Sequence, residues 1–145
     1  MTIQRMDHVG VVVEDLAGAI DFFVALGLEL QGGGIVEGRA VDRIVGLDGV
    51  RSEFAFVQTP DGHGRLELIA FRSPPPQDGH PHAPANTPGL RHLAFAVDDI
   101  HAAVERLQAR GNALVGELVN YDDSYWLCYV RGPEGIIVEL AEKIA

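Results

Sequence analysis

Apolar positions along the chain follow two periods, and the change from one to the other happens twice. Residues 93–97 alternate bulky with small side chains, and residues 9–13 likewise place valine at every second position, with glycine at residue 10. This is the pattern of a half-buried β-strand. Each run passes into helical spacing. The apolar stripes are Leu16, Ile20 and Phe23 in the first case and Val97, Ile100, Val104 and Leu107 in the second. Each segment is therefore predicted to begin with a strand and continue as an amphipathic helix.

These two segments are copies of each other. Residues 7–16 align with residues 91–100 at a constant offset of 84 positions, which points to an internal duplication. Aspartates precede both helical stripes as N-caps, and glycines follow them where a left-handed C-terminal residue is favoured. These boundary residues are Asp15 and Gly27 in the first copy, and Asp99 and Gly111 in the second.

Short β-rich runs follow each helix, separated by glycine and proline. The predicted strands are residues 28–31, 52–58 and 65–71 in the first copy, and residues 113–119, 125–130 and 136–141 in the second. Glycines 32–34 and residues 46–49 are expected to be breaks, with a short extra helix over residues 36–45. Each copy therefore has the order β-α-β-β-β, and the fold class is α+β.

A proline-rich segment separates the copies. Six of the eight prolines lie between residues 73 and 89, a composition typical of a stiff, extended linker. We therefore expect a single domain over residues 1–145, with module 1 at about residues 1–72, the linker at residues 73–89 and module 2 at about residues 90–145.

The charge and composition narrow the range of partners. The formal net charge is −10, so nucleic acid and anionic membranes are expected to be repelled, and the expected ligand is a small molecule. No apolar run reaches the length of a membrane span, and residues 1–5 lack the apolar core of a signal peptide. Cys128 is the single cysteine, so no intrachain disulfide forms, and we expect a cytoplasmic protein.

Two histidines occupy equivalent places in the first strands of the copies. His8 shares one strand face with Gly10, and His92 shares the corresponding face with Ala94 and Ala96. Small neighbours leave open space beside each imidazole, which a ligand cleft needs and a close-packed core avoids.

Two glutamates repeat in the same way. Glu67 and Glu139 each lie in an otherwise apolar strand that follows a glycine-containing turn. A carboxylate that faces inward from such a strand is costly unless it is paired or binds a metal. Two histidines and two glutamates suit a six-coordinate divalent ion with two open positions.

With these four positions, the chain resembles the vicinal oxygen chelate superfamily, which includes glyoxalase I, methylmalonyl-CoA epimerase, extradiol dioxygenases and bleomycin-binding proteins. The resemblance covers nearly the whole chain and implies that the two modules curl into a half-barrel cleft. It implies that His8, Glu67, His92 and Glu139 bind one divalent ion, either Ni, Co, Mn, Fe or Zn. In many dimeric members, each site takes its ligand pairs from different subunits. Two half-open modules expose sheet edges and an apolar face that a monomer of this size covers poorly, so we expect a homodimer.

The chemistry implied by the resemblance is proton transfer on a substrate with two neighbouring oxygens. The metal stabilises an enolate or enediolate, and a ligand carboxylate moves the proton; Glu139 is the expected base, with Glu67 as the alternative. A glyoxalase I-like lyase or epimerase-like isomerase is expected. The alternatives are a dioxygenase of the same superfamily, which normally uses three protein ligands, and a drug-binding resistance protein without catalysis.

Several other residues have more than one interpretation. Arg65 and Arg131 either contact an anionic substrate or balance nearby carboxylates, and Trp126 lines either the cleft or a module interface. The pair at residues 122–123 is a solvated loop or a cover for substrate. Cys128 is expected to be a small packed residue rather than a reactive thiol.

Overall fold

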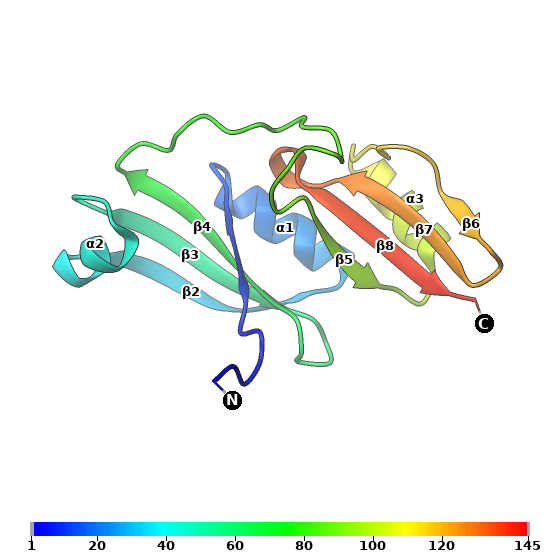
Figure 1. Ribbon diagram of the computed structural model, residues 1–145, viewed down its shortest axis with the longest axis horizontal. Helices are drawn as coiled ribbons and strands as arrows, with labels where there is room; N and C mark the ends of the chain where they lie inside the picture. The colour runs from blue at the N-terminus through cyan, green and yellow to red at the C-terminus, as the bar shows by residue number, and fades with distance from the viewer. Residues whose placement is uncertain (1, 145) are drawn as a thin grey trace. The chain divides into compact units, whose positions relative to one another are not determined.

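The computed structural model describes residues 2–144, and the chain divides after Asp78 into two compact units. Each unit is a four-stranded mixed sheet with a helix packed against it (Figure 1). The two units are described separately below.

The first unit contains four strands and two helices. In chain order they are β1 (Val9–Val12), α1 (Leu16–Leu26), β2 (Glu29–Glu37), α2 (Arg39–Val45), β3 (Arg51–Gln58) and β4 (Arg65–Ser73). The strand order is β1-β4-β3-β2, with β1 parallel to β4 and the other neighbours antiparallel. The first strand thus pairs with the last, and β2 forms the far edge.

The second unit repeats this arrangement. Its elements are β5 (His92–Ala96), α3 (Ile100–Ala109), β6 (Val119–Tyr121), β7 (Tyr125–Arg131), the short 3₁₀ helix η1 (Pro133–Gly135) and β8 (Ile137–Lys143). The strand order β5-β8-β7-β6 matches that of the first unit, and β5 is again parallel to the last strand. The predicted pair of βαβββ modules in an α+β fold is therefore confirmed.

One face of each sheet packs against its helix and forms the core. In the first unit, Phe22 and Phe23 of α1 are buried together with Leu66 and Leu68 of β4. In the second, Leu107 of α3 is buried, as are Cys128 and Val130 of β7 and Val138 and Leu140 of β8. The intervening strand residues, which face away from the helix, keep part of their surface exposed. These opposite faces carry the polar residues of interest.

The helix boundaries lie where the repeat predicts them. The Asp15 side chain accepts a hydrogen bond from the Gly18 backbone N–H, and Asp99 does the same for Ala102. Gly27, which ends α1, has φ of 125°, a conformation that a side chain disfavours. N-cap chemistry therefore determines where both helices start.

Two predicted strand assignments were wrong. Glycines 32–34 do not break the chain but continue β2, and a side chain at Gly33 would collide with the Phe54 carbonyl of β3. Close approach of two backbones thus explains that glycine, and the extra helix begins only at Arg39. Residues 113–118 form no strand apart from an isolated bridge between Leu114 and Val130, and β6 is only three residues long.

The segment preceding β5 is held against the second unit. The Arg131 guanidinium donates hydrogen bonds to the carbonyl oxygens of Ala83 and Gly135, both at 2.8 Å. One arginine thereby joins the proline-rich segment to the loop around η1. Among residues 2–144, no helix is long and apolar enough to cross a membrane.

Candidate functional site

In the first unit, His8 and Glu67 lie side by side on the sheet face opposite α1. The His8 Nε2 atom is 3.7 Å from Glu67 Oε1, and both side chains are partly exposed. The strand register explains the proximity. Gly10 of β1 pairs with Glu67 of β4, and His8, two residues before Gly10, is on the same face of the sheet. With no side chain at Gly10, the space beside the imidazole stays open.

In the second unit, His92 and Glu139 form the corresponding pair. The His92 Nε2 atom is 3.1 Å from Glu139 Oε1. Here Ala94 of β5 pairs with Glu139 of β8, as Gly10 pairs with Glu67 in the first unit. The four residues singled out in the sequence thus come together as two pairs, one in each unit.

An aromatic residue completes each pair on the neighbouring strand. Phe56 of β3 lies opposite Glu67, and its ring meets the His8 ring edge-on at 5.3 Å. Tyr129 of β7 lies opposite Glu139, and its ring is 5.1 Å from that of His92. Each unit therefore presents a glutamate and an aromatic ring on adjacent strands, with a histidine at the start of the next strand. His92 is the first residue of β5, and His8 directly precedes β1.

The spacing within each pair fits shared ligation of one cation. Two ligand atoms about 2.1 Å from an ion and at right angles to each other are about 3 Å apart, and a tetrahedral angle gives about 3.4 Å. The observed nitrogen–oxygen distances of 3.1 Å and 3.7 Å lie close to this range. Imidazole nitrogens and carboxylate oxygens are suitable donors for Zn, Ni, Co, Mn or Fe.

Each pair alone supplies only two donors. Within residues 2–144, no three His, Cys, Asp or Glu side chains come together as a potential metal cluster.

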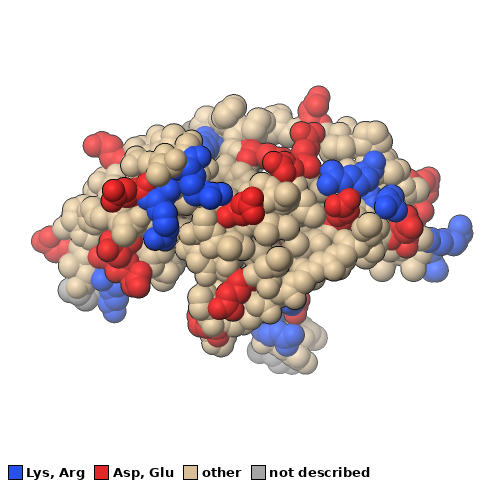
Figure 2. Space-filling view, turned by 180° about the vertical axis from the view of Figure 1, so that it is seen from behind, with Lys and Arg blue, Asp and Glu red and all other residues tan. Residues whose placement is uncertain are grey.

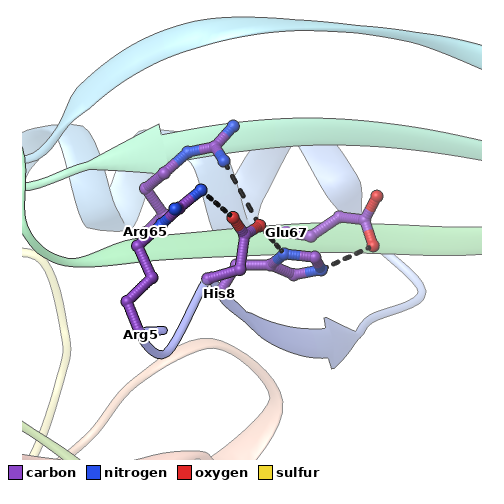
Figure 3. A network of polar contacts seen from close by, with 5 residues as sticks. Arg5, His8, Arg65 and Glu67 are labelled. Carbon is purple, nitrogen blue, oxygen red and sulfur yellow. Dashed lines mark hydrogen bonds and ion pairs between the residues drawn. The ribbon is translucent and has the colours of Figure 1, made fainter. Parts of the chain in front are cut away.

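A second polar network surrounds His8 on the side away from Glu67. The His8 Nδ1 atom is 2.7 Å from an Asp7 carboxylate oxygen, and Arg5 and Arg65 approach the same carboxylate at 3.1 Å and 3.6 Å. Figure 3 shows both arginines converging beside His8, whose opposite edge faces Glu67. The hydrogen bond with His8, assisted by the one from Arg5, lowers the pKa of Asp7.

The structure resolves several open interpretations. Trp126 lies on the helix side of its sheet, where its ring packs against His101 of α3 at 4.8 Å. Cys128 is buried on that side as predicted, and burial raises the pKa of its thiol. Arg131 bonds backbone carbonyls within its own unit, whereas Arg65 reaches the Asp7 carboxylate.

Three further histidines and the pair at residues 122–123 lie on exposed segments outside helices and strands. His63, His80 and His82 are exposed, and all three are outside helices and strands. Asp122 and Asp123 form the tight turn between β6 and β7, where both adopt positive φ. A hydrogen bond from the Asp123 backbone N–H to Asn120 closes that turn, which favours the solvated-loop interpretation.

Charged groups of both signs are mixed on the face seen in Figure 2. Lys and Arg side chains lie there in small groups with Asp or Glu beside them, and no extended basic surface is visible on that face. This distribution offers no track for a phosphate backbone on the side shown.

Sequence reasoning missed three residues of the two sites. Asp7 directly precedes His8, but a neighbour in a strand normally faces the other way, so its contact was not apparent. Phe56 and Tyr129 are revealed by strand register, which aligns each with a glutamate. The signal for the aromatic residues was present in the hairpins, since each turn fixes the pairing of its strands.

Comparison with known proteins identifies the family to which the chain belongs. The family model described as "Glyoxalase/Bleomycin resistance protein/Dioxygenase superfamily" matches residues 7–129. The uncharacterized protein YwbC of Bacillus subtilis is 28% identical over 144 residues, covering 97% of this chain and 98% of that protein.

Solved structures agree with this result. A glyoxalase family protein from Bacillus cereus is 46% identical with a TM-score of 0.97, covering 100% of this chain and 97% of that one. The antibiotic binding protein TnmS3 from a Streptomyces species is 24% identical with a TM-score of 0.65, covering 99% and 98% of the two chains, and shows the same fold. The chain belongs to the glyoxalase/bleomycin resistance protein/dioxygenase superfamily.

Proposed function

We propose that this protein is a metal-dependent, glyoxalase-like lyase or isomerase that acts on a small substrate with two neighbouring oxygens. The observation that carries the proposal is the repeated His–Glu pair, with separations of 3.7 Å and 3.1 Å at the same register in two sheets. A structural role rarely requires both residues to recur in register on the exposed face of a duplicated module.

His8, Glu67, His92 and Glu139 would hold the metal ion. When bound there, a divalent cation supplies a Lewis acid that polarises two adjacent substrate oxygens. The histidines contribute neutral donors and the glutamates two negative charges, so the ligand set neutralises a divalent ion. Gly10 and Ala94, opposite the glutamates, leave space for the substrate.

The proposed base is Glu139, which removes a proton from the substrate carbon next to a carbonyl group. The C–H bond breaks and its electron pair forms a C=C bond, while the carbonyl π pair moves to the carbonyl oxygen. The protonated Glu139 then gives the proton to the former carbonyl carbon, and the hydroxyl proton of the first carbon passes to the neighbouring oxyanion. Glu67 lies at the equivalent position and is the alternative base. Tyr129, whose ring is beside His92, flanks Glu139 and shields one side of the reacting group.

Two further candidates are retained for specific reasons. The antibiotic binding protein with this fold makes binding without turnover the second candidate. A dioxygenase fits less well, since the fourth ligand would occupy a position that oxygen and substrate need.

The experiment is a panel assay on protein loaded separately with Ni²⁺, Co²⁺, Mn²⁺, Fe²⁺ and Zn²⁺. The substrates are thiol adducts of 2-oxoaldehydes and epimeric acyl-CoA thioesters, and the controls are chelated protein and His63→Ala. Turnover that is lost in the chelated protein and persists in His63→Ala supports the proposal. Tight binding of panel compounds without turnover by any metal form would favour the binding protein instead.

We also propose that the protein is a homodimer. The edge strand β2 is exposed along its whole length, with Leu30 and Ile35 each about half exposed. Ile44 of the adjacent α2 is 84% exposed. An exposed strand edge with apolar side chains favours pairing with another chain, and a second copy is the simplest partner.

A further inference from the structure

The two histidines differ in what contacts the nitrogen that faces away from the glutamate. Residues 7 and 91 are equivalent in the repeat, but the first is aspartate and the second is arginine. The Asp7 carboxylate lies 2.7 Å from His8 Nδ1. Within the described part of the chain, the His92 ring contacts the Glu139 carboxylate and the Tyr129 ring. The two His–Glu pairs are therefore chemically unequal.

The Asp7–His8 contact determines which ring nitrogen carries the proton. An ionised carboxylate only accepts hydrogen bonds, so a contact of 2.7 Å requires His8 Nδ1 to be the donor. In neutral imidazole the proton then resides on Nδ1, and the lone pair of Nε2 is free. That nitrogen is the one 3.7 Å from Glu67.

Three neighbours hold the Asp7 carboxylate in place. Arg5 contacts one oxygen at 3.1 Å, while His8 and Arg65 share the other. The Arg65 guanidinium is itself fixed above the Phe56 ring, 4.2 Å from its centre. Since that ring also packs edge-on against His8, the aspartate, the arginine and the histidine form one connected arrangement.

From this geometry we infer that Asp7 is a positioning residue, which orients His8 and presents its Nε2 lone pair toward Glu67, whereas His92 has no such carboxylate among residues 2–144. A carboxylate that accepts from the far nitrogen of a metal-ligating histidine fixes the tautomer and makes the ligand more basic. The first pair is therefore set for a cation before the cation arrives.

This inference rests on the proposed function in one respect, namely that His8 is a metal ligand. The orientation itself is a property of the metal-free protein. It can therefore be measured separately from metal binding, and the two claims can fail independently.

The first measurement is the tautomer of His8 in metal-free protein, by long-range ¹H–¹⁵N NMR at roughly pH 8.5, where imidazoles are neutral. The His8→Ala variant assigns the signal. We expect the Nδ1–H tautomer in the wild type and its loss in Asp7→Ala. The matched control is Asp21→Ala, an exposed aspartate on α1, the helix that packs on the opposite face of the sheet. The same tautomer in wild type and Asp7→Ala would overturn the inference.

The second measurement is the affinity for Ni²⁺ alone, by calorimetry on the same proteins and on Arg91→Ala. Loss of such a carboxylate typically weakens metal binding about 10- to 100-fold, and this is expected for Asp7→Ala. Asp21→Ala and Arg91→Ala are expected to bind as the wild type does. Unchanged affinity in Asp7→Ala contradicts the positioning role. A wild type that binds no metal contradicts the proposed function, and the tautomer then decides the orientation alone.

Discussion

Cys128 provides a prediction at the scale of single residues. The side chain is 4% exposed, and burial raises the pKa of its thiol, so little reactive thiolate is present near neutral pH. We expect native protein to react with a thiol reagent such as dithionitrobenzoate far more slowly than unfolded protein. Full reaction of one thiol per chain is expected in guanidinium chloride. Rapid reaction in the native state would show that the strand interior opens.

Glu139 is the residue on which the proposed reaction depends most. Substitution by glutamine keeps the size and one neutral oxygen donor but removes the base. We expect Glu139→Gln to retain substantial metal while kcat falls about 100-fold or more, as is usual for a lost general base.

Glu67→Gln is the matched comparison because it makes the same change at the equivalent position. A larger loss in Glu67→Gln than in Glu139→Gln would transfer the role of base to the first module. Near wild-type turnover in both variants would contradict the mechanism.

Residue identities alone were sufficient to select the two His–Glu pairs. Duplication made His8 and His92 stand out, since a chance histidine has no counterpart 84 positions away. Asp7 could not be selected in the same way, because its counterpart is Arg91 and the repeat is broken there. Its role depends on a contact between adjacent side chains that strand periodicity does not predict.

At the scale of elements, the start of α3 provides a stability test. The Asp99 carboxylate accepts a hydrogen bond from the Ala102 backbone N–H at the helix N-terminus. Asp99→Ala removes this cap and should lower the free energy of unfolding by about 1 kcal/mol, measured by urea denaturation. An exposed aspartate outside the helices, Asp78, provides the control as Asp78→Ala. Equal stability of the two variants would mean that the cap contributes nothing.

The turn between β3 and β4 predicts a dependence on pH. The Thr59 hydroxyl and the His63 backbone N–H both donate to Asp61, and these hydrogen bonds lower its pKa. A lowered pKa means that the folded state binds the proton less tightly than the unfolded state. The resulting stability is present above the unfolded pKa and is lost as the pH falls through the folded one.

We therefore expect Asp61→Ala to melt at a lower temperature than wild type near neutral pH. The difference should shrink in acid, below the folded-state pKa of Asp61. Thermal melting followed by circular dichroism across this range measures it. A difference that stays constant into strong acid would mean that the Asp61 charge has no part in stabilising the turn.

Prediction of the elements succeeded where local chemistry dominates and failed where tertiary contacts do. N-caps and apolar stripes located α1 and α3, and the central strands β3, β4, β7 and β8 lie within a few residues of their predicted ranges. Gly33 was misjudged because its neighbour Phe54 lies on another strand. The segment before β6 has the composition of a strand, but the structure pairs it only at Leu114.

For the whole molecule, the proposed homodimer is directly measurable. The exposed edge and apolar residues of β2 favour a partner, so light scattering at micromolar concentration should give twice the chain mass of 15.6 kDa. Metal content should be measured on the same sample. A monomer that carries bound metal would show that one chain completes the site by itself.

The proposed function depends on whether both His–Glu pairs hold the same ion. Elemental analysis of protein purified without chelator decides this, comparing wild type with His8→Ala, His92→Ala and the exposed control His63→Ala. We expect about one divalent ion per chain in the wild type and the control, and loss of most of it in each of the other two variants. Wild-type metal content in His92→Ala, or a wild type without bound ion, would contradict the central claim.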